Sequence, residues 1–138
     1  MILGLPGETY KSWVDGIGYL LDAHINNQII VYQSEVYPNT EMNEKKYREK
    51  YKIKTLKLDL STLKDDAAMK EHLEVVVGTY SMTKNDWKKM NLFSYLMMIM
   101  HSFKAGFYIM NYLKKEFKVS GKEFLLYIIN KYIYSIII

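Results

Sequence analysis

The segment Gly4-Leu5-Pro6-Gly7-Glu8-Thr9 carries the residue types in this chain that are best suited to holding a ligand. The two glycines allow the backbone to turn tightly and to approach a ligand closely, and the proline between them stiffens the turn. A helix that starts directly after such a loop presents unpaired N–H groups, which favour polar and anionic ligands. The pattern predicts a binding loop between a strand and a helix, in which Glu8 is either a contact residue or an ordinary acid of the first helical turn.

Gln33 and Glu35 form a second candidate site. They lie two positions apart near the end of an apolar stretch, so in an extended strand both side chains point to the same face. In a barrel that face can point inward to a substrate, whereas the alternative is hydrogen bonding to neighbouring loops. The residues alone leave both interpretations open.

The 138 residues include no cysteine. Disulfides, thiolate zinc sites, a cysteine nucleophile and a cysteine-ligated iron–sulfur cluster are therefore excluded within the chain, and the absence fits a reducing compartment. The histidines at 24, 72 and 101 show no metal-ligand spacing, and His101 lies in an apolar segment typical of a packed histidine. No Ser-His-Asp set or His-Glu-x-x-His motif is present. We predict neither a catalytic residue nor a metal ligand here.

The elements that position the candidate residues begin with a strand, a helix and a strand. Residues 8–23 repeat apolar side chains at helical spacing, and residues 28–37 contain the apolar run Ile29–Tyr32. Such a run is typical of a strand buried on both faces. We therefore expect a βαβ unit in which Ile2–Leu3 pairs in parallel with Ile29–Tyr32.

The following residues are predicted to be mixed in structure. Residues 41–51 are a short charged helix, and residues 53–60 alternate apolar and polar side chains, as in an exposed strand or extended loop. Residues 65–77 are predicted to be helical, although Val75–Val77 favours a strand locally.

Capping signals mark the helices of the last third. Thr83 with Asp86 resembles a capping box, and Ser120 with Glu123 is a full one that opens a helix over residues 124–138.

Taken together, these elements predict the fold class. We expect an α/β fold, with a partial (β/α) barrel over residues 1–60 and an α-helical region over residues 61–138.

The charge pattern and the hydropathy of the chain limit the kinds of partner that it is expected to bind. The net charge of +4 arises from lysines interleaved with acids, which is typical of a solvated surface and indicates no nucleic-acid partner. The apolar windows Met90–Met100 and Phe124–Ile138 are shorter than the roughly 20 residues that span a bilayer. We expect no transmembrane span.

Three segments, in order along the chain, resemble the radical S-adenosylmethionine (SAM) superfamily, in particular its proteins with a cobalamin (B12)-binding domain. Ile2–Thr9 (ILGLPGET) is similar to the end of the fifth barrel strand, which lies beside SAM in that family. Val31-Tyr32, followed by Val36–Met42 (VYPNTEM), resembles the sixth strand and its exit loop. Val75–Thr83 (VVVGTYSMT), followed by Asp86-Trp87, resembles the segment after the barrel.

The resemblance implies a parent enzyme of the (β/α) barrel type with a [4Fe-4S] cluster, SAM and cobalamin. Such an enzyme cleaves SAM reductively and performs radical chemistry or methyl transfer. Gly4, Gly7 and Glu8 would form its SAM-proximal loop, and Gln33 and Glu35 would face the substrate. The family's C-x-x-x-C-x-x-C motif is absent. We therefore expect a cytoplasmic C-terminal fragment that is inactive alone, binds none of these cofactors by itself, and has as its partner the missing N-terminal portion of the same enzyme.

Two alternatives come from other classes of function. The chain could be an accessory subunit that completes a separate, cysteine-bearing half-barrel. It could instead be a helical membrane-surface protein that uses Phe124–Ile138. The resemblance points to no particular substrate.

Overall fold

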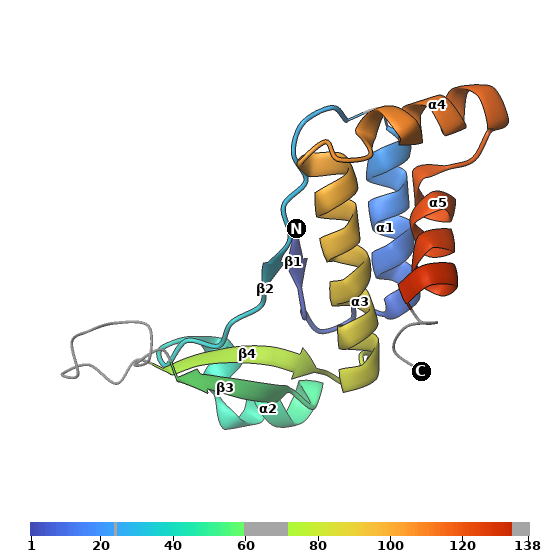
Figure 1. The fold of residues 1–138 in the computed structure, drawn as a ribbon. Helices are drawn as coiled ribbons and strands as arrows, with labels where there is room; N and C mark the ends of the chain where they lie inside the picture. Colours follow the sequence, from blue (N-terminus) through green and yellow to red (C-terminus); the bar gives the residue numbers. More distant parts are fainter. Residues whose placement is uncertain (24, 60–71, 134–138) are drawn as a thin grey trace. The chain divides into compact units, whose positions relative to one another are not determined.

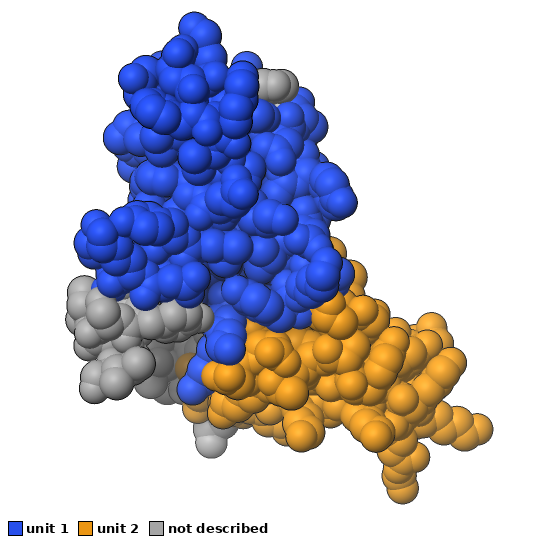
Figure 2. Space-filling view, turned by 90° about the vertical axis from the view of Figure 1, so that its right-hand side faces the viewer, with its two compact units in different colours: residues 1, 10–31, 88–138 blue, residues 2–9, 32–87 orange. Residues whose placement is uncertain are grey.

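The structure, a computed structural model, describes residues 1–23, 25–59 and 72–133. Its residues form two compact units, and neither unit is a single stretch of chain. Unit 1 comprises residues 1, 10–31 and 88–138, and unit 2 comprises residues 2–9 and 32–87 (Figure 2).

Unit 1 is helical. Its helices are α1 (Tyr10–Asp22), most of α3 (Lys84–Met97), α4 (Phe107–Phe117) and α5 (Gly121–Ile128) (Figure 1). Helix α3 continues into a π-helical turn at Met98–Ser102, and α5 continues into another at Ile129–Ile133. The predicted helix over residues 8–23 is confirmed as α1, which buries one apolar stripe, namely Trp13, Val14, Ile17 and Leu21.

Close contacts between small residues and neighbouring side chains pack these helices. The indole N–H of Trp13 donates to Ser94 Oγ of α3 at 2.9 Å. A Cβ built on Gly18 of α1 would lie 3.1 Å from Lys122 Cδ, and one on Gly121 of α5 would lie 3.1 Å from a Leu21 methyl carbon. Glycine at these two positions therefore lets α1 and α5 approach each other closely.

The π-helical turn holds the chain that follows α1. Ser102 Oγ accepts from the backbone N–H of Ile29 at 2.9 Å and donates to the carbonyl of the same residue at 2.8 Å. Lys104 donates to the Asn26 carbonyl at 2.6 Å. Single π-helical turns inside α-helices are often found at functional positions. Here the turn and the residues after it hold the segment from Asn26 to Ile29.

Unit 2 is built on two small sheets. Strands β1 (Ile2–Leu3) and β2 (Tyr32–Gln33) pair in parallel, with Ile2 opposite Tyr32 and Leu3 opposite Gln33. Strands β3 (Lys54–Asp59) and β4 (His72–Gly78) form an antiparallel pair. A 3₁₀ turn at Glu41–Asn43 and helix α2 (Lys45–Tyr51) lie between β2 and β3 in the chain, which confirms the short charged helix.

Backbone hydrogen bonds join the two sheets through residues 34–36. The backbone N–H of Ser34 donates to the Leu3 carbonyl at 2.8 Å, and the Ser34 carbonyl accepts from the backbone N–H of Val76 at 2.9 Å. The backbone N–H of Val36 donates to the Glu74 carbonyl at 2.8 Å. The residues after β2 therefore run antiparallel to β4. The α/β class and the parallel pairing of Ile2–Leu3 with a second strand are confirmed, but the partner residues are Tyr32–Gln33 and not the predicted Ile29–Tyr32, and the partial barrel stays a prediction.

Two expected elements need correction. The second strand has two residues in place of the predicted ten, because Ile29 and Ile30 belong to unit 1 and Ile29 is held there by Ser102. The helix expected over residues 65–77 is wrong for its described part, since residues 72–78 form β4. Here the local β propensity of Val75–Val77 prevailed, supported by pairing with β3; residues 60–71 lie outside the described ranges.

Both predicted capping signals are confirmed. Thr83 and Asp86 exchange side-chain-to-backbone hydrogen bonds at 3.0 and 3.1 Å at the start of α3. Ser120 and Glu123 do the same at the start of α5, at 2.8 and 3.2 Å. Among the described helices, none has the length and apolar character needed to cross a bilayer.

Candidate binding loop of unit 2

The loop between β1 and α1 contains a tight turn at Leu5-Pro6-Gly7-Glu8. The backbone N–H of Glu8 donates to the Leu5 carbonyl at 3.3 Å, and Gly7 has φ +96°. Proline followed by a glycine of positive φ is the arrangement that a type II β-turn requires. The turn places Glu8 before α1, which begins at Tyr10 and has no acid in its first turn. The interpretation of Glu8 as a first-turn acid is therefore wrong.

Gly4 is needed at its position for two reasons. Its φ of +109° is one that side chains other than hydrogen rarely adopt. A Cβ at this position would also lie 3.2 Å from the Val76 carbonyl and 3.3 Å from Ser34 Cβ. The close approach that the sequence predicted at Gly4 is therefore made to the chain's own backbone and fills this part of the loop.

Gly7 joins the loop to a second loop, Thr79–Ser81, which follows β4. The backbone N–H of Gly7 donates to Ser81 Oγ at 3.0 Å, and Ser81 Oγ lies 3.1 Å from Thr79 Oγ1. The Tyr80 backbone N–H donates to the Tyr51 carbonyl at 2.8 Å. Two of the segments that carry the resemblance, distant in sequence, are thus in direct contact within unit 2.

Gly7 is also the open part of the loop. A Cβ built there would meet only the Tyr80 hydroxyl, at 3.6 Å, so the position faces open space beside that hydroxyl. The amides of Gly7 and Glu8 are already used, by Ser81 and Leu5. At Gly7 a ligand could therefore contact backbone that carries no side chain, next to the hydroxyl of Tyr80.

Gln33 and Glu35 have hydrogen-bond partners within unit 2. Gln33 Oε1 accepts from the indole N–H of Trp87 at 3.1 Å, and Glu35 Oε2 accepts from the Tyr37 hydroxyl at 2.5 Å. The Glu35 carboxylate raises the pKa of Tyr37 above its ordinary value of 10.0. Ser34, the residue between them, packs against Gly4. The segment of chain that carries Gln33 and Glu35 therefore lies beside the loop.

An ion pair fixes the sheet that carries Thr79–Ser81. Both terminal guanidinium nitrogens of Arg48 donate to the Glu74 carboxylate, at 2.9 and 2.8 Å, and these hydrogen bonds hold the pKa of Glu74 below its ordinary value. Both side chains are largely buried, at 25% and 18% exposure. Thr55 donates to the same carboxylate at 2.5 Å, so α2, β3 and β4 are tied at one point.

The histidines form no site among the residues described. His101 is buried, its Nε2 shares a hydrogen bond with the Asn27 carbonyl at 3.2 Å, and burial lowers its pKa. The interpretation of His101 as a packed histidine is thus confirmed. His72 is exposed at the start of β4, and His24 lies outside the described residues. In the described part of the chain no three His, Cys, Asp or Glu side chains gather as metal ligands would.

Sequence reasoning missed Tyr80, Ser81 and Trp87 as members of this region. The available signal is their place in or next to the third resembling segment, Val75–Thr83 with Asp86-Trp87, which marks the family but does not by itself indicate a contact with the loop. The contacts that bring them together span 74 residues between Gly7 and Ser81 and 54 between Gln33 and Trp87.

Comparison with known proteins supports the resemblance. The chain is 30% identical over 128 residues to the cobalamin-dependent radical SAM methyltransferase TokK of Streptomyces tokunonensis, and 29% identical over 128 residues to the 2-(S-pantetheinyl)-carbapenam-3-carboxylate methyltransferase of Streptantibioticus cattleyicolor. Each match covers 90% of this chain and 18% of the relative. No protein-family model matches the chain. The similarity to cobalamin-dependent radical SAM proteins that the sequence predicted is confirmed.

Proposed function

We propose that this chain serves as a C-terminal portion of a cobalamin-dependent radical SAM enzyme, where it supplies the last part of the (β/α) barrel and the helical region after it. The observation that carries the proposal is the similarity over 90% of the chain to two methyltransferases, one of which is named for cobalamin and radical SAM. The parallel β1–β2 pair and the contact between its loop and Thr79–Ser81 agree with it. The boundary near residue 60 between the barrel and the later region is part of the proposal, and the later region begins, in its described part, with β4 before its helices.

The chain does not fit the iron–sulfur cluster of such an enzyme. Cluster irons are held by cysteine thiolates, and the 138 residues include none. The thiolates must therefore come from outside these residues. When bound, the cluster and SAM supply the one-electron chemistry, and the protein supplies position and exclusion of water.

The loop at Gly4–Glu8 fits a supporting contact to SAM. Its turn is held rigid by the Leu5–Glu8 and Gly7–Ser81 hydrogen bonds, and Gly7 presents backbone without a side chain. A flat or crowded ligand group can approach such a surface closely. In this proposal Gly4 shapes the loop from behind, Gly7 meets the ligand, and Glu8 is the polar group beside it.

Gln33 and Glu35 are proposed to face the substrate. Their present partners, Trp87 and Tyr37, already hold the two side chains in fixed directions. A carboxylate and an amide held in this way can orient a substrate through hydrogen bonds without first losing rotamer freedom.

The proposal can be tested in a chimera of TokK in which the matched 128-residue segment is replaced by the aligned residues of this chain. We expect the purified chimera, reconstituted with iron and sulfide without oxygen, to form a [4Fe-4S] cluster and to cleave SAM. Cluster absorption reports that the chimera has folded. A chimera that holds the cluster but neither binds nor cleaves SAM would contradict the proposal.

Two further samples complete the experiment. The isolated 138-residue chain, treated in the same way, should gain no cluster absorption and cleave no SAM, because it has no thiolate. Gly7→Val in the chimera should lower SAM affinity and leave cluster content unchanged, whereas Lys88→Gln, an exposed position in α3, should change neither.

A further inference from the structure

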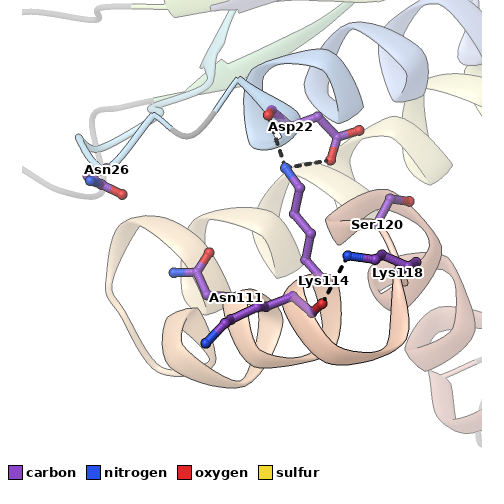
Figure 3. A pocket seen from close by; sticks show the side chains of 7 residues that line it. Asp22, Asn26, Asn111, Lys114, Lys118 and Ser120 are labelled. Carbon is purple, nitrogen blue, oxygen red and sulfur yellow. Dashed lines mark hydrogen bonds and ion pairs between the residues drawn. The ribbon is translucent and has the colours of Figure 1, made fainter.

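Unit 1 has an open hollow of about 840 Å³ between the end of α1, the residues after it, and α4 with the turn that follows. We call it the lysine hollow. Figure 3 shows the Asn26 and Asn111 amides on one side and Lys118 and Ser120 on the other. The lining residues are Asp22, Asn26, Asn111, Lys114, Lys115, Lys118 and Ser120. Its size falls within the range of small-molecule sites, roughly 300–1,000 Å³.

The side chains around the hollow are mostly cationic. Three lysines and one aspartate line the hollow, which gives the lining a formal charge of +2, and Lys115 Nζ also lies 3.6 Å from the carboxylate of its neighbour Glu116. Lys114 is held in place by Asp22, whose carboxylate lies 3.2 Å from its Nζ and whose carbonyl accepts from it at 3.0 Å. Lys118 Nζ donates to the Lys115 carbonyl at 3.2 Å, a neutral group that positions the ammonium without cancelling its charge.

The neutral groups of the lining are also suited to binding oxygen atoms. The carboxamides of Asn26 and Asn111 have no side-chain hydrogen bond to any described residue, and each can donate twice. The Ser120 hydroxyl, by contrast, is committed to Glu123 in the capping box. The donors thus consist of three ammonium groups and two amides, against the carboxylates of Asp22 and Glu116, and this excess of donors matches a ligand with several anionic oxygens.

Helix geometry explains part of this arrangement but not all of it. Lys114 and Lys115 stand in the last turn of α4, where cations stabilise the negative end of the helix dipole. That effect does not require a concave surface, nor amides from a different segment of chain on its other side. Asn26 comes from the loop after α1, and that loop is fixed by Lys104 and Ser102.

We propose that the lysine hollow binds a small organic anion that carries carboxylate or phosphate groups. Lys118 and Lys115 contact the anionic oxygens, Lys114 is positioned by Asp22, and Asn26 and Asn111 donate to the remaining oxygens. This inference does not rest on the proposed function, because every residue it uses belongs to unit 1 and none to the loop of unit 2.

The test is a titration of the full chain with citrate and, separately, with pyrophosphate, followed by amide chemical shifts at physiological salt. We expect saturable shifts confined to residues 22–26 and 111–120. The anion that binds more tightly identifies whether carboxylate or phosphate is preferred. Shifts that stay linear to millimolar concentration, or that spread over all lysine-bearing surfaces, would overturn the proposal, because they are the signature of charge screening.

Substitutions then locate the site. Lys115→Gln with Lys118→Gln should weaken binding about tenfold or more, the loss expected for two charge-assisted contacts. Neither lysine is buried, so the variant should retain the wild-type spectrum elsewhere. The control Lys88→Gln removes one exposed charge on α3 of the same unit and should change affinity less than about twofold. The same loss of binding free energy per charge removed in both variants would show that net charge alone is responsible and would refute the site.

Discussion

The contacts within unit 1 differ in kind from the contacts within unit 2. The helices of unit 1 have local sequence signals, since the apolar stripe of α1 and the Ser120–Glu123 cap of α5 each lie within a short stretch of chain. In unit 2, β1 requires Tyr32 and Gln33, residues 34–36 require β4, and Gly7 requires Ser81. The difference teaches that the strands and loops of unit 2 need distant pairs to form at all, whereas the helices of unit 1 have local sequence signals and need distant pairs, such as Trp13 with Ser94, only to pack together.

The two tryptophans report on the two units separately. Trp13 belongs to unit 1 and Trp87 to unit 2, and the chain has no other tryptophan. With 5-fluorotryptophan incorporated, the chain should give two ¹⁹F signals, one for each unit. Their unfolding in denaturant can then be followed in one sample, and each substitution below can be assigned to the unit it affects.

The largest effect is expected from Phe93→Ala in unit 1. The Phe93 side chain is fully buried, so its removal leaves a cavity and should cost about 3–5 kcal/mol of unfolding free energy. The Trp13 signal should move to much lower denaturant. Tyr95→Ala, an exposed residue of the same helix, is the control and should shift it little. If the Trp87 signal moves equally in Phe93→Ala, the two units unfold as one and the comparison fails.

Gly4→Ala should produce the largest effect in unit 2. The substitution places a Cβ at φ +109° and 3.2 Å from the Val76 carbonyl, which should cost about 2–3 kcal/mol. The Trp87 signal should report the loss. Gly7→Ala has a similar φ but space for its Cβ, so a smaller loss is expected. A larger loss for Gly7→Ala would show that the steric account of Gly4 is wrong.

The same contrast explains how far the sequence could predict the molecule. Helix α1, the caps at Thr83 and Ser120, and the packed His101 were predictable because each depends on residues close in sequence. That Ile29 belongs to unit 1 could not be predicted, because its apolar side chain fits a strand equally well. The residue that holds it in unit 1, Ser102, is 73 residues away in the sequence. Strand β4 was mispredicted as helix because its pairing with β3 leaves no local sign other than three valines.

The candidate site was predicted in part. The glycines of the loop were recognised because a tight turn has a sequence signature. Their partners were not, since nothing in Gly7 indicates Ser81, and nothing in Gln33 indicates Trp87. Likewise Arg48 and Glu74 are ordinary charged residues until α2 and β4 bring them together.

That ion pair gives unit 2 an acid-sensitive contact. Because Arg48 lowers the folded-state pKa of Glu74, the stability it contributes is present above the ordinary value of 4.5 and is lost as the pH falls through the lowered one. Glu74→Gln should cost about 1–2 kcal/mol at neutral pH and should flatten the fall of the Trp87 midpoint below pH 4.5. An unchanged acid profile in the variant would assign the fall to other carboxylates.

The smallest expected effect has the opposite sign and belongs to unit 1. Gly16 lies within α1, its φ is not positive, and a Cβ built on it meets nothing within 4 Å. Glycine in such a position costs stability because its unfolded chain is more flexible than that of alanine. Gly16→Ala should therefore stabilise unit 1 by about 0.5–1 kcal/mol and raise the midpoint of the Trp13 signal, while the Trp87 signal stays unchanged.

Gly18, two positions along the same helix, is the matched control. Its helix propensity gain is the same, but a Cβ there would lie 3.1 Å from Lys122 Cδ, and Lys122 is paired with Asp15 at 3.1 Å. Gly18→Ala must displace that side chain or push α5 away, so the gain should vanish or reverse. Stabilisation by both substitutions would show that α1 and α5 are not in close contact in solution. Stabilisation by Gly16→Ala alone would confirm that local propensity and helix packing, measured on one helix, act separately in unit 1.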